Sequence, residues 1–551
     1  MTQDTDAGRL SEDQPPASHP GRGPFPLALA GALAAGAGAA LAHPPFGFWI
    51  GLIGYPLLML LSEGRRTRRG AFAVGWAAGF AYFLISCWWV AEAFLVNPDA
   101  HAWMAPFAAT LLPMGLAIFW GLASLLYRWL KPQGVLRFFV FTALFCGLEW
   151  LRGHVLTGFP WNPAGASWEA GTPASQAAAV VGIYGLSFLT VAGLTAFAPL
   201  LTPGSRKRRV GAAVLGVVLL AALHIGGQAR LLNAHVQTRD LSIRIVQADV
   251  PQEAKWSPER FRSIVLRYVN LSSRTGALTP DIIVWPEGAL PAEANELLAA
   301  ESWTAPAIGR ALEPGQTLLF GGYRMGERPD VYFNSLIAAR DDGSPLLEPV
   351  AVYDKHRLVP FGEYLPLAGL MTRTGLRSLV HMPSDFSAGP RPRPLDLGPE
   401  LGQVQPLICY EGLYAGLPDG RAGRPQWIVN VSNDAWFGRT SGPLQHLNLA
   451  AYRAIEQGLP MVRATPTGSS AVIDPWGRIR DDQRLDPGES GVIDARLPEA
   501  LASTPYSRFG DLMFLVLIVS GLTPLVLRRP RVEHGHMQPG PKGVGPVTEE
   551  D

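Results

Sequence analysis

The stretch Val404-Gln-Pro-Leu-Ile-Cys-Tyr-Glu-Gly412 is typical of a buried β-strand that runs into a tight turn. Such a turn presents Cys409 at the end of the strand. A free thiol has a pKa of about 8.5, so little of it is ionised at neutral pH, and a nucleophilic cysteine needs a base beside it. The oxyanion that forms on an attacked carbonyl group needs a fixed positive charge. We therefore interpret Cys409 as a nucleophile whose partners lie elsewhere in the chain.

Two other short segments supply those partners. Ile282-Ile-Val-Trp-Pro-Glu-Gly288 ends an apolar run in the carboxylate of Glu287, and Tyr353-Asp-Lys-His-Arg357 offers the ammonium of Lys355. Glu287, Lys355 and Cys409 fit the roles of base, oxyanion stabiliser and nucleophile. Each has an ordinary alternative by itself, because a buried cysteine is usually a small apolar residue and a charged residue after a strand usually faces water. The combination favours a catalytic site.

The composition indicates a membrane protein with more than one domain. Of 551 residues, 48% are hydrophobic and only 17% are charged. The net charge of +1 gives no argument for nucleic-acid binding. Cys87 and Cys146 lie inside apolar runs, which leaves Cys409 alone in the polar part of the chain and excludes an internal disulfide there.

Eight apolar runs have lengths near the roughly 20 residues that span a bilayer as a helix. They lie at residues 25–42, 46–62, 71–96, 103–130, 135–151, 178–202, 210–227 and 511–527. Arginine and lysine cluster after alternate runs, at 65–69, 128–137, 206–209 and 528–531. Almost no basic charge occurs in the opposite loops, at 43–45, 97–102 and 153–175.

Loops rich in arginine and lysine remain on the cytoplasmic side of a membrane. We therefore predict eight transmembrane helices, with both termini in the cytoplasm and residues 228–510 on the outer side. In this division, 1–24 is a disordered cytoplasmic tail and 25–227 is a seven-helix membrane domain. The eighth helix is 511–527, and 528–551 is a second cytoplasmic tail.

Between residues 241 and 497 the pattern changes to short β-rich runs separated by turns rich in glycine and proline. The predicted strands are 242–250, 281–285, 317–323, 332–339, 404–409, 427–431 and 470–475. The predicted helices are 258–275, 292–300 and 445–457. Strands that alternate with helices favour an α/β domain with largely buried sheets.

Three motifs together resemble one known family. They are Trp-Pro-Glu at 285–287, Asp-Lys-X-X-Leu-Val-Pro-Phe-Gly-Glu at 354–363 and Cys-Tyr-Glu at 409–411, in this order and after a membrane domain. The combination resembles the apolipoprotein N-acyltransferases, membrane-embedded members of the nitrilase superfamily, from about residue 25 to about residue 527. The resemblance implies an αββα sandwich for residues 228–510, a place in the bacterial inner membrane and an enzyme without a cofactor.

The resemblance also implies a reaction. Such an enzyme takes an acyl chain from a phospholipid, holds it as a cysteine thioester and transfers it to the N-terminal α-amine of diacylglyceryl-cysteine in an apolipoprotein. Carried over residue by residue, Glu287 is the general base, Lys355 stabilises the oxyanion and Cys409 carries the acyl group. We expect the enzyme to act as a monomer.

Further residues match the family around this site, namely Trp256, Glu363, Tyr410, Glu411 and Asn433. Glu363 would keep Lys355 charged and oriented, although it could also be a turn residue that faces water. The backbone N–H of Tyr410 would donate to the oxyanion. The alternative for Tyr410 and Glu411 is that they pack or cap the turn.

Two loops complete the predicted pocket. Trp256 would lie against an acyl chain or at the membrane interface, with plain packing as its alternative. Asn430, Asn433 and Asp434 would shape the pocket by hydrogen bonds. The apolar stretches 365–371 and 376–380 predict a mobile lid that enters the membrane interface.

Three ionisable residues in the membrane domain lie near its predicted outer face. They are Glu92, Glu149 and Arg152, and the following Thr157-Gly-Phe-Pro-Trp161 also matches the family. Ionisable side chains inside a membrane domain either have a function or extend to the membrane–water interface, where their charge is solvated. We predict that they anchor a lipid headgroup or a loop.

The sequence contains no histidine or cysteine spacing typical of a metal site and no glycine-rich loop typical of a nucleotide site. Two alternatives to the acyltransferase remain open. A membrane-tethered nitrilase-like amidase would use the same three residues with water as the acceptor. A lipid-binding or transport scaffold would have an inactive soluble domain, but the intact set of Glu287, Lys355 and Cys409 counts against it.

Overall fold

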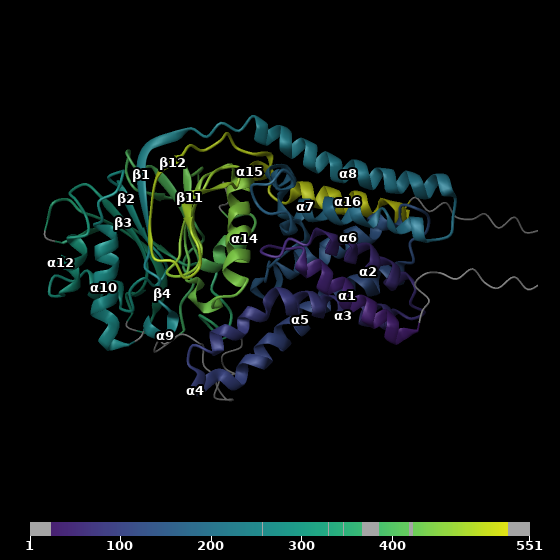
Figure 1. Cartoon of the computed structure of the whole chain (residues 1–551), viewed down its shortest axis with the longest axis horizontal. Helices are drawn as coiled ribbons and strands as arrows, with labels where there is room; N and C mark the ends of the chain where they lie inside the picture. Colours follow the sequence, from purple (N-terminus) through teal and green to yellow (C-terminus); the bar gives the residue numbers. More distant parts are fainter. Residues whose placement is uncertain are drawn as a thin grey trace, which may run out of the picture.

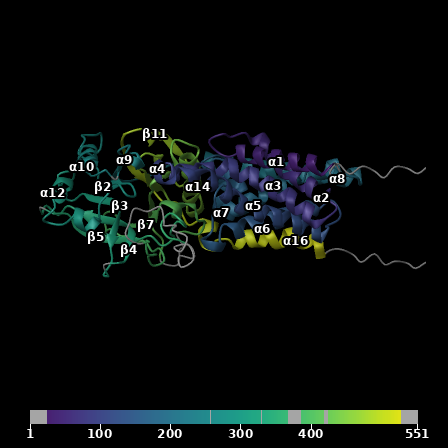
Figure 2. The ribbon, with the colours of Figure 1, turned by 90° about the horizontal axis from the view of Figure 1, so that it is seen from below.

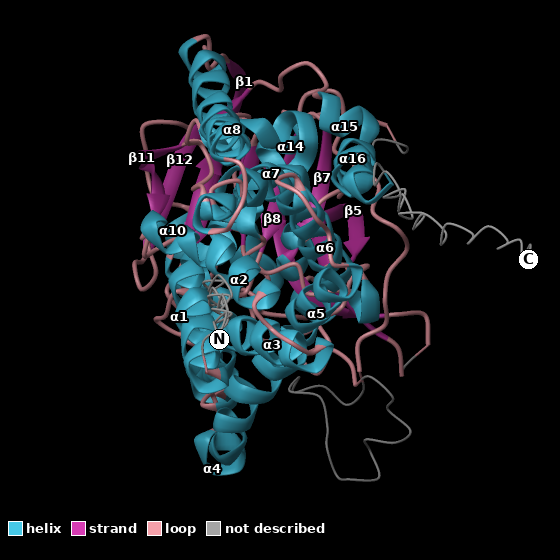
Figure 3. Ribbon diagram, turned by 90° about the vertical axis from the view of Figure 1, so that its right-hand side faces the viewer, coloured by secondary structure: helices cyan, strands magenta, loops and turns pink. Residues whose placement is uncertain are grey.

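A computed structural model of the protein describes residues 24–255, 257–328, 330–344, 346–365, 385–417 and 423–526. A bundle of apolar helices forms one end of the molecule and a domain of strands forms the other (Figure 1). The two parts keep this order when the molecule is turned by 90° (Figure 2). Seen from the helical end, the helices lie in front of the strands (Figure 3).

The helical part contains every predicted apolar run. Its elements are α1 (Phe25–Leu41), η1 (Trp49–Ile53), α2 (Gly54–Glu63), α3 (Arg68–Cys87), η2 (Trp88–Phe94), α4 (Pro98–His101), η3 (Ala102–Met104), α5 (Ala105–Leu130), α6 (Arg137–Arg152), η4 (Val155–Thr157), η5 (Ala164–Ser167), η6 (Ala174–Ala177), α7 (Ala178–Thr195), η7 (Ala198–Leu201), α8 (Arg206–Leu232) and α16 (Leu512–Val526).

Among the described residues, four helical segments can cross a membrane by length and composition. They are Arg68–Phe94, Pro98–Leu130, Ala174–Leu201 and Arg206–Leu232. Shorter apolar helices lie at Phe25–Leu41, Trp49–Glu63 and Leu512–Val526. The membrane character of this part is therefore confirmed, whereas the count of eight spans stays a prediction.

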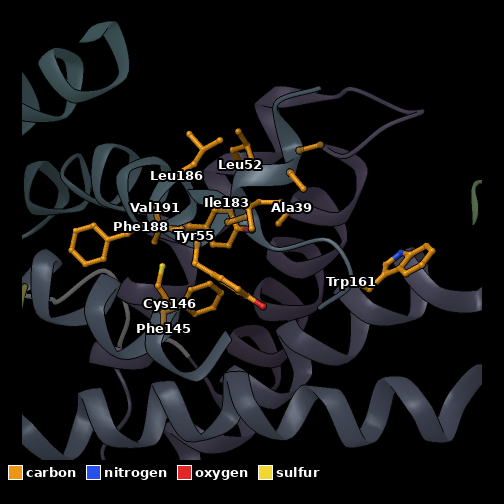
Figure 4. Close-up of a cluster of buried hydrophobic side chains, with 14 of the residues drawn as sticks. Ala39, Leu52, Tyr55, Phe145, Cys146, Trp161, Ile183, Leu186, Phe188 and Val191 are labelled. Atoms are coloured by element: carbon orange, nitrogen blue, oxygen red, sulfur yellow. The ribbon is translucent and has the colours of Figure 1, made fainter. Parts of the chain in front are cut away.

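Aromatic side chains fill the centre of the bundle. The ring centroid of Trp120 on α5 lies 4.7 Å from that of Tyr82 on α3 and 4.8 Å from that of Phe145 on α6. Tyr55 on α2 packs edge-on against Phe145 at 5.5 Å. Figure 4 shows Tyr55, Phe145 and Cys146 in one cluster with side chains of α7. Tilted and edge-to-face ring pairs of this kind add to the packing that joins the helices.

The basic clusters that separate the predicted spans meet at one end of the bundle. Arg137 donates hydrogen bonds to Glu63 at 2.6 Å and to the Thr202 hydroxyl at 2.8 Å. Arg209 donates to the carbonyl oxygen of Thr202 at 2.9 Å. Segments predicted to lie on the same side of the membrane are thus neighbours in the folded protein.

The strand domain contains two six-stranded sheets. The first has the order β12-β1-β2-β3-β4-β5, with β12 (Gly491–Pro498), β1 (Thr238–Gln247), β2 (Ile282–Trp285), β3 (Thr317–Met325), β4 (Tyr332–Arg340) and β5 (Glu348–Asp354). The second has the order β11-β10-β9-β8-β7-β6, with β11 (Ile479–Leu485), β10 (Ser470–Ile473), β9 (Met461–Ala464), β8 (Trp427–Val431), β7 (Gln403–Ile408) and β6 (Leu395–Asp396). Strands β1 to β3 run parallel, as do β7 to β9, and the outer pairs are antiparallel.

Helices cover the outer faces of the two sheets. Helix α10 (Pro258–Ser272) packs on the first sheet and α14 (Gly442–Gln457) on the second. Shorter helices lie in the connections: α9 (Gln252–Lys255), α11 (Ala294–Leu297), α12 (Thr304–Gly309), η9 (Cys409–Leu413), η11 (Asp434–Phe437) and α15 (Pro505–Phe509). The sheets face each other across a core that includes Ile245 and Val429. On the outer face of the first sheet, Tyr268 of α10 packs on Trp285 with ring centroids 5.1 Å apart. Helix α14 lies between the second sheet and the helical bundle (Figure 1).

Several predicted element boundaries are wrong, and five strands were missed. The helix predicted at 292–300 is only α11, the strand predicted at 242–250 ends at Gln247, and the helix predicted at 258–275 ends at Ser272. Strands β5, β6, β9, β11 and β12 were not predicted. Edge strand β11 is mostly charged and solvent-facing, so it lacks the hydrophobic alternation that reveals a strand.

The bundle holds the strand domain through a polar interface along α14. Trp161 donates to the side chain of Gln445 at 2.8 Å, and Asn448 donates to the carbonyl oxygen of Ala166 at 3.0 Å. Both bundle residues belong to the loop 153–175, which was predicted to face the outer side. This loop therefore forms part of the contact surface between the bundle and the strand domain.

Candidate active site

Cys409 directly follows β7 and opens η9 with a backbone φ of 50°. A positive φ is uncommon for residues other than glycine, and such conformations cluster at functional sites. The turn predicted from the sequence thus begins at the thiol-bearing residue itself. Cys409 is half-buried, whereas Cys87 and Cys146 are buried. Of the three cysteines, Cys409 is the one with exposed surface.

Glu287 lies in the turn after β2, packed closely against β3. Gly321 of β3 allows this approach, because a Cβ at residue 321 would lie 2.5 Å from the Cα of Glu287. The buried carboxylate accepts hydrogen bonds from the Asn334 side chain at 2.6 Å and from the backbone N–H of Asn433 at 2.8 Å. The charge of this carboxylate also acts on the Cys409 thiol. Glu287 is therefore held within the reach that a general base needs.

Lys355 directly follows β5 and is buried between two carboxylates. Its Nζ lies 3.0 Å from Oε1 of Glu363 and 3.4 Å from Oε1 of Glu287. The second oxygen of Glu363 accepts a hydrogen bond from the backbone N–H of Val359 at 2.8 Å. Glu363 thus faces Lys355 and not water, which is the arrangement that keeps an ammonium charged and oriented.

Asn334 is a site residue that the sequence did not reveal. It is buried near the start of β4 and donates to Glu363 at 2.7 Å as well as to Glu287. One amide group therefore bridges the two carboxylates that hold Lys355. Its only signal in the sequence is a polar residue inside a strand that is otherwise mostly apolar.

Glu411 joins the two strand ends that carry Lys355 and Cys409. Its side chain is fully buried. The carboxylate accepts four hydrogen bonds, from the Tyr353 hydroxyl at 2.8 Å and from the backbone N–H groups of His356 at 2.9 Å, Arg357 at 3.1 Å and Ile408 at 2.8 Å. These donors flank Lys355 and Cys409 in the chain, so Glu411 fixes the ammonium and the thiol relative to each other.

Two family models match the chain. Residues 35–196 match the apolipoprotein N-acyltransferase N-terminal domain, and residues 242–506 match carbon-nitrogen hydrolase. The apolipoprotein N-acyltransferase of Caulobacter vibrioides is 52% identical over 509 residues, which cover 90% of this chain and 94% of that protein. The protein of the same name from Rhodopseudomonas palustris is 40% identical over 522 residues, with the same coverage of 90% and 94%. This chain belongs to the apolipoprotein N-acyltransferase family.

The two regions matched by the family models coincide with the two parts of the fold. The N-terminal model lies within the helical bundle, and the carbon-nitrogen hydrolase model spans both sheets and ends in α15. In this apolipoprotein N-acyltransferase family member, the turns after β2, β5, β7 and β8 carry the residues that were predicted as catalytic, and four of those predicted as supporting, namely Glu363, Tyr410, Glu411 and Asn433. Strand ends at one edge of a sheet domain are a common place for such sites.

The charges of the site leave the thiol protonated at rest. Burial, together with the negative charge of Glu287, raises the pKa of the Cys409 thiol to about 12. Burial would also raise the pKa of Glu287, but the charge of Lys355 and the hydrogen bond from Asn334 lower it. Burial would lower the pKa of Lys355, but Glu287 and Glu363 raise it. The resting site therefore holds a neutral thiol, an ionised carboxylate and an ammonium.

A buried polar cluster lies behind the thiol. Ser432 donates to Asp434 at 2.7 Å. Asp434 forms an ion pair with Arg463 of β9 at 2.8 Å. Asn430 donates to the backbone of β7 at 3.1 Å. Asn430 and Asp434 thus support the strand end that carries Cys409, and Ser432 and Arg463 were not predicted.

Asn433 connects the turn of Glu287 to the loop after β1. Its backbone N–H binds Glu287, and its side chain donates to Gln252 of α9 at 3.1 Å. Trp256, which was predicted to act from the same loop, lies outside the described residues. Residues 366–384, which contain nearly all of the predicted lid, lie outside them as well.

Tyr410 acts at the contact with the helical bundle. Its hydroxyl donates to the carbonyl oxygen of Gly158, in the loop after α6. The hydroxyl of Tyr414 donates to the carbonyl oxygen of Thr157 in the same loop at 2.9 Å. The helix that begins at Cys409 is therefore fastened to the membrane part of the protein.

Glu149 and Arg152 anchor that loop. They form a buried ion pair at 2.7 Å. Arg152 also donates to the carbonyl oxygens of Phe159 and Trp161. Of the two roles predicted for these residues, loop anchoring is the one that their contacts favour. Glu92 lies against the loop after η11, where its Oε2 would be 2.6 Å from a Cβ at Gly438.

Proposed function

We propose that this protein transfers an acyl chain from a phospholipid to the N-terminal α-amine of a diacylated apolipoprotein, through a thioester on Cys409. The observation that carries the proposal is the set formed by Cys409, Glu287 and Lys355, whose strand ends are joined by Glu411 and held beside the bundle by Tyr410. The relatives from Caulobacter vibrioides and Rhodopseudomonas palustris, named apolipoprotein N-acyltransferase, support it.

In the first half-reaction, the sulfur of Cys409 attacks the ester carbonyl carbon of the phospholipid while Glu287 accepts the thiol proton. The pKa of the thiol lies far above that of Glu287, so the transfer is uphill unless the new C–S bond forms at the same time. The negative charge then moves to the carbonyl oxygen, where Lys355 stabilises it. The C–O bond breaks, Glu287 returns the proton to the departing oxygen, and a lysophospholipid leaves.

In the second half-reaction, the free α-amine of the apolipoprotein attacks the thioester carbonyl carbon. Glu287 accepts a proton from the attacking nitrogen, and Lys355 again stabilises the oxyanion. The C–S bond breaks, an amide is left on the acceptor, and the sulfur of Cys409 regains its proton. Binding of the two substrates in turn at one cysteine is a ping-pong mechanism.

The experiment that tests this function is intact mass spectrometry of the full-length protein after incubation with phospholipid alone. We expect one acyl mass on the peptide that contains Cys409, and we expect hydroxylamine at neutral pH to remove it, as for a thioester. Cys409→Ala is the negative control and should gain no acyl mass. Addition of a diacylated lipopeptide with a free α-amine should then discharge the adduct and yield a triacylated peptide.

Two outcomes of that experiment would contradict the acyltransferase. Rapid discharge to water with release of free fatty acid would indicate an amidase-type hydrolase. No adduct under any condition, with function unaffected by Cys409→Ala, would leave the lipid-binding or transport scaffold.

We further propose that all eight apolar helices cross the bacterial inner membrane, with the strand domain on the outer side and the protein acting as a monomer. Helix α8 supports this orientation, because it starts at the basic cluster 206–209 and ends at Leu232, six residues before β1 begins at Thr238. Its 27 residues extend about 40 Å at 1.5 Å per residue, enough to cross a bilayer.

The orientation predicts which engineered cysteines an impermeant maleimide can reach. In a background in which the three native cysteines are replaced by alanine, Asp342→Cys, in an exposed turn of the strand domain, should be labelled in cells with a permeabilised outer membrane. Ser205→Cys, exposed beside the basic cluster before α8, should react only after the inner membrane is broken. The reverse labelling pattern would place the strand domain in the cytoplasm.

A further inference from the structure

Lys255 is a second buried lysine at the site, and the reaction described above gives it no role. It ends α9, which Gln252 ties to Asn433 by a hydrogen bond of 3.1 Å. Only 4% of its surface is exposed. Its ammonium reaches the turn after Glu287, where Nζ would lie 2.6 Å from a Cβ at residue 288. Gly288, with φ of 55°, leaves the space that the ammonium occupies.

Lys255 differs from Lys355 in having no partner. Lys355 is shared by two carboxylates, whereas Lys255 makes no hydrogen bond or ion pair with any other residue in the part of the chain that the structure describes. A buried ammonium without a partner is strongly unfavourable. Burial lowers the pKa of Lys255 to about 8, although the charge of Glu287 opposes this shift. The site thus holds a cation that the charge of Glu287 reaches but that pairs directly with no carboxylate among the described residues.

We propose that Lys255 binds the phosphodiester group of the phospholipid donor and thereby places the donor ester beside Cys409. The assignment rests on the proposed acyltransferase function. Phosphate oxygens accept charge-assisted hydrogen bonds from lysine, and such contacts are among the stronger ones in proteins. Lys355 cannot take this role, because its ammonium already serves Glu287, Glu363 and the developing oxyanion.

The charge of Lys255 selects the donor and not the acceptor. In a phospholipid, the phosphodiester and the ester that reacts belong to the same glycerol unit, so an anion lies close to the reacting carbonyl group. The acceptor reacts through an α-amine, which becomes a cation on protonation and is repelled by an ammonium. Lys255 should therefore act in acylation of Cys409 and not in the transfer that follows.

The test compares two donors that differ only in the phosphoethanolamine headgroup. Acylation of Cys409 is followed by intact mass spectrometry with phosphatidylethanolamine or with a diacylglycerol of the same acyl chains, in the same detergent micelles. For Lys255→Met, we expect acylation by subsaturating phosphatidylethanolamine to fall at least about tenfold, with the loss mainly in KM, because a hydrogen bond to a charged group is removed. Acylation by diacylglycerol should stay within about twofold of wild type, because that donor has no phosphate to lose.

Two further variants separate binding of phosphate from other effects. Lys255→Arg should retain most of the activity with phosphatidylethanolamine, because it keeps the charge and the donors. Arg260→Met is the matched control, since it removes a positive charge from an exposed position five residues away and should leave both donors unaffected. Thermal unfolding of Lys255→Met should occur no lower than that of wild type, because an unpaired buried charge is removed.

Phosphate binding by Lys255 can be tested separately from the proposed reaction by measuring equilibrium binding of the same two lipids to Cys409→Ala, which cannot form the thioester. If Lys255→Met weakens binding of phosphatidylethanolamine but not of diacylglycerol in this background, the assignment stands even where wild type forms no adduct. Equal losses with both donors, no loss with either, or a loss confined to transfer onto the lipopeptide would each overturn it.

Discussion

Glu287→Gln is expected to slow acylation of Cys409 by phospholipid at least about a hundredfold, the usual range for loss of a general base. The amide keeps the shape of the side chain and can still accept the hydrogen bond from Asn334. It cannot take the proton of the thiol, so the sulfur has no base to make it nucleophilic as it attacks the ester. The measurement is the rate at which the acyl mass appears on wild type and on the variant.

The same substitution should have the opposite effect on a small alkylating reagent. Burial and the negative charge of Glu287 raise the pKa of the Cys409 thiol. Removal of the charge should lower that pKa and speed alkylation by iodoacetamide about tenfold at mildly alkaline pH. Glu296→Gln, at an exposed position on α11, is the matched control and should change neither rate. Parallel loss of acylation and of alkylation would indicate a disordered site and would argue against Glu287 as the base.

Glu411→Ala is expected to cause the largest loss of stability. It leaves the Tyr353 hydroxyl and the N–H groups of His356, Arg357 and Ile408 without an acceptor in a fully buried place. Buried donors left unpaired cost about 1–3 kcal/mol each and do not add fully, so we expect a loss of at least about 3 kcal/mol. For a domain of this size that lowers the unfolding temperature by roughly 6–12 °C.

A graded variant shows whether the hydrogen bonds are responsible. Glu411→Gln keeps one carbonyl oxygen, which can still accept from Tyr353, His356 and Arg357, and it loses only the acceptor of the Ile408 N–H. Its stability should therefore lie between wild type and Glu411→Ala. Glu400→Gln, at an exposed position before β7, is the control. The unfolding temperature, measured by scanning fluorimetry, and the acylation rate should fall together. If both are unchanged in Glu411→Ala, the proposed link between the strand ends is ruled out.

The chemistry of the site could be predicted from the sequence because each reacting group follows its own strand. The apolar runs before Glu287 and Cys409 have the length and composition of buried strands, and the turn signals after them expose the next polar residue. The helices of the bundle could also be predicted from local composition, because a long apolar run is typical of a membrane-spanning helix. Lys355 was found from its motif, although strand β5 before it was not predicted.

Other residues of the site could not be predicted because their roles depend on which strand ends meet. Asn334 looks like an ordinary strand residue until β4 brings it between Glu287 and Glu363. Lys255 looks like an ordinary loop lysine until α9 is folded over Gly288.

By itself the sequence determined the apolar runs and most of the strands of the α/β domain, because these follow from local composition and periodicity, and its three motifs pointed to Glu287, Lys355 and Cys409. The tertiary structure decided the order of the two sheets and the docking of α14 on loop 153–175. It also decided that Glu411 accepts hydrogen bonds from both strand ends. These features depend on contacts between segments far apart in the chain, for which hydrophobic periodicity carries no information.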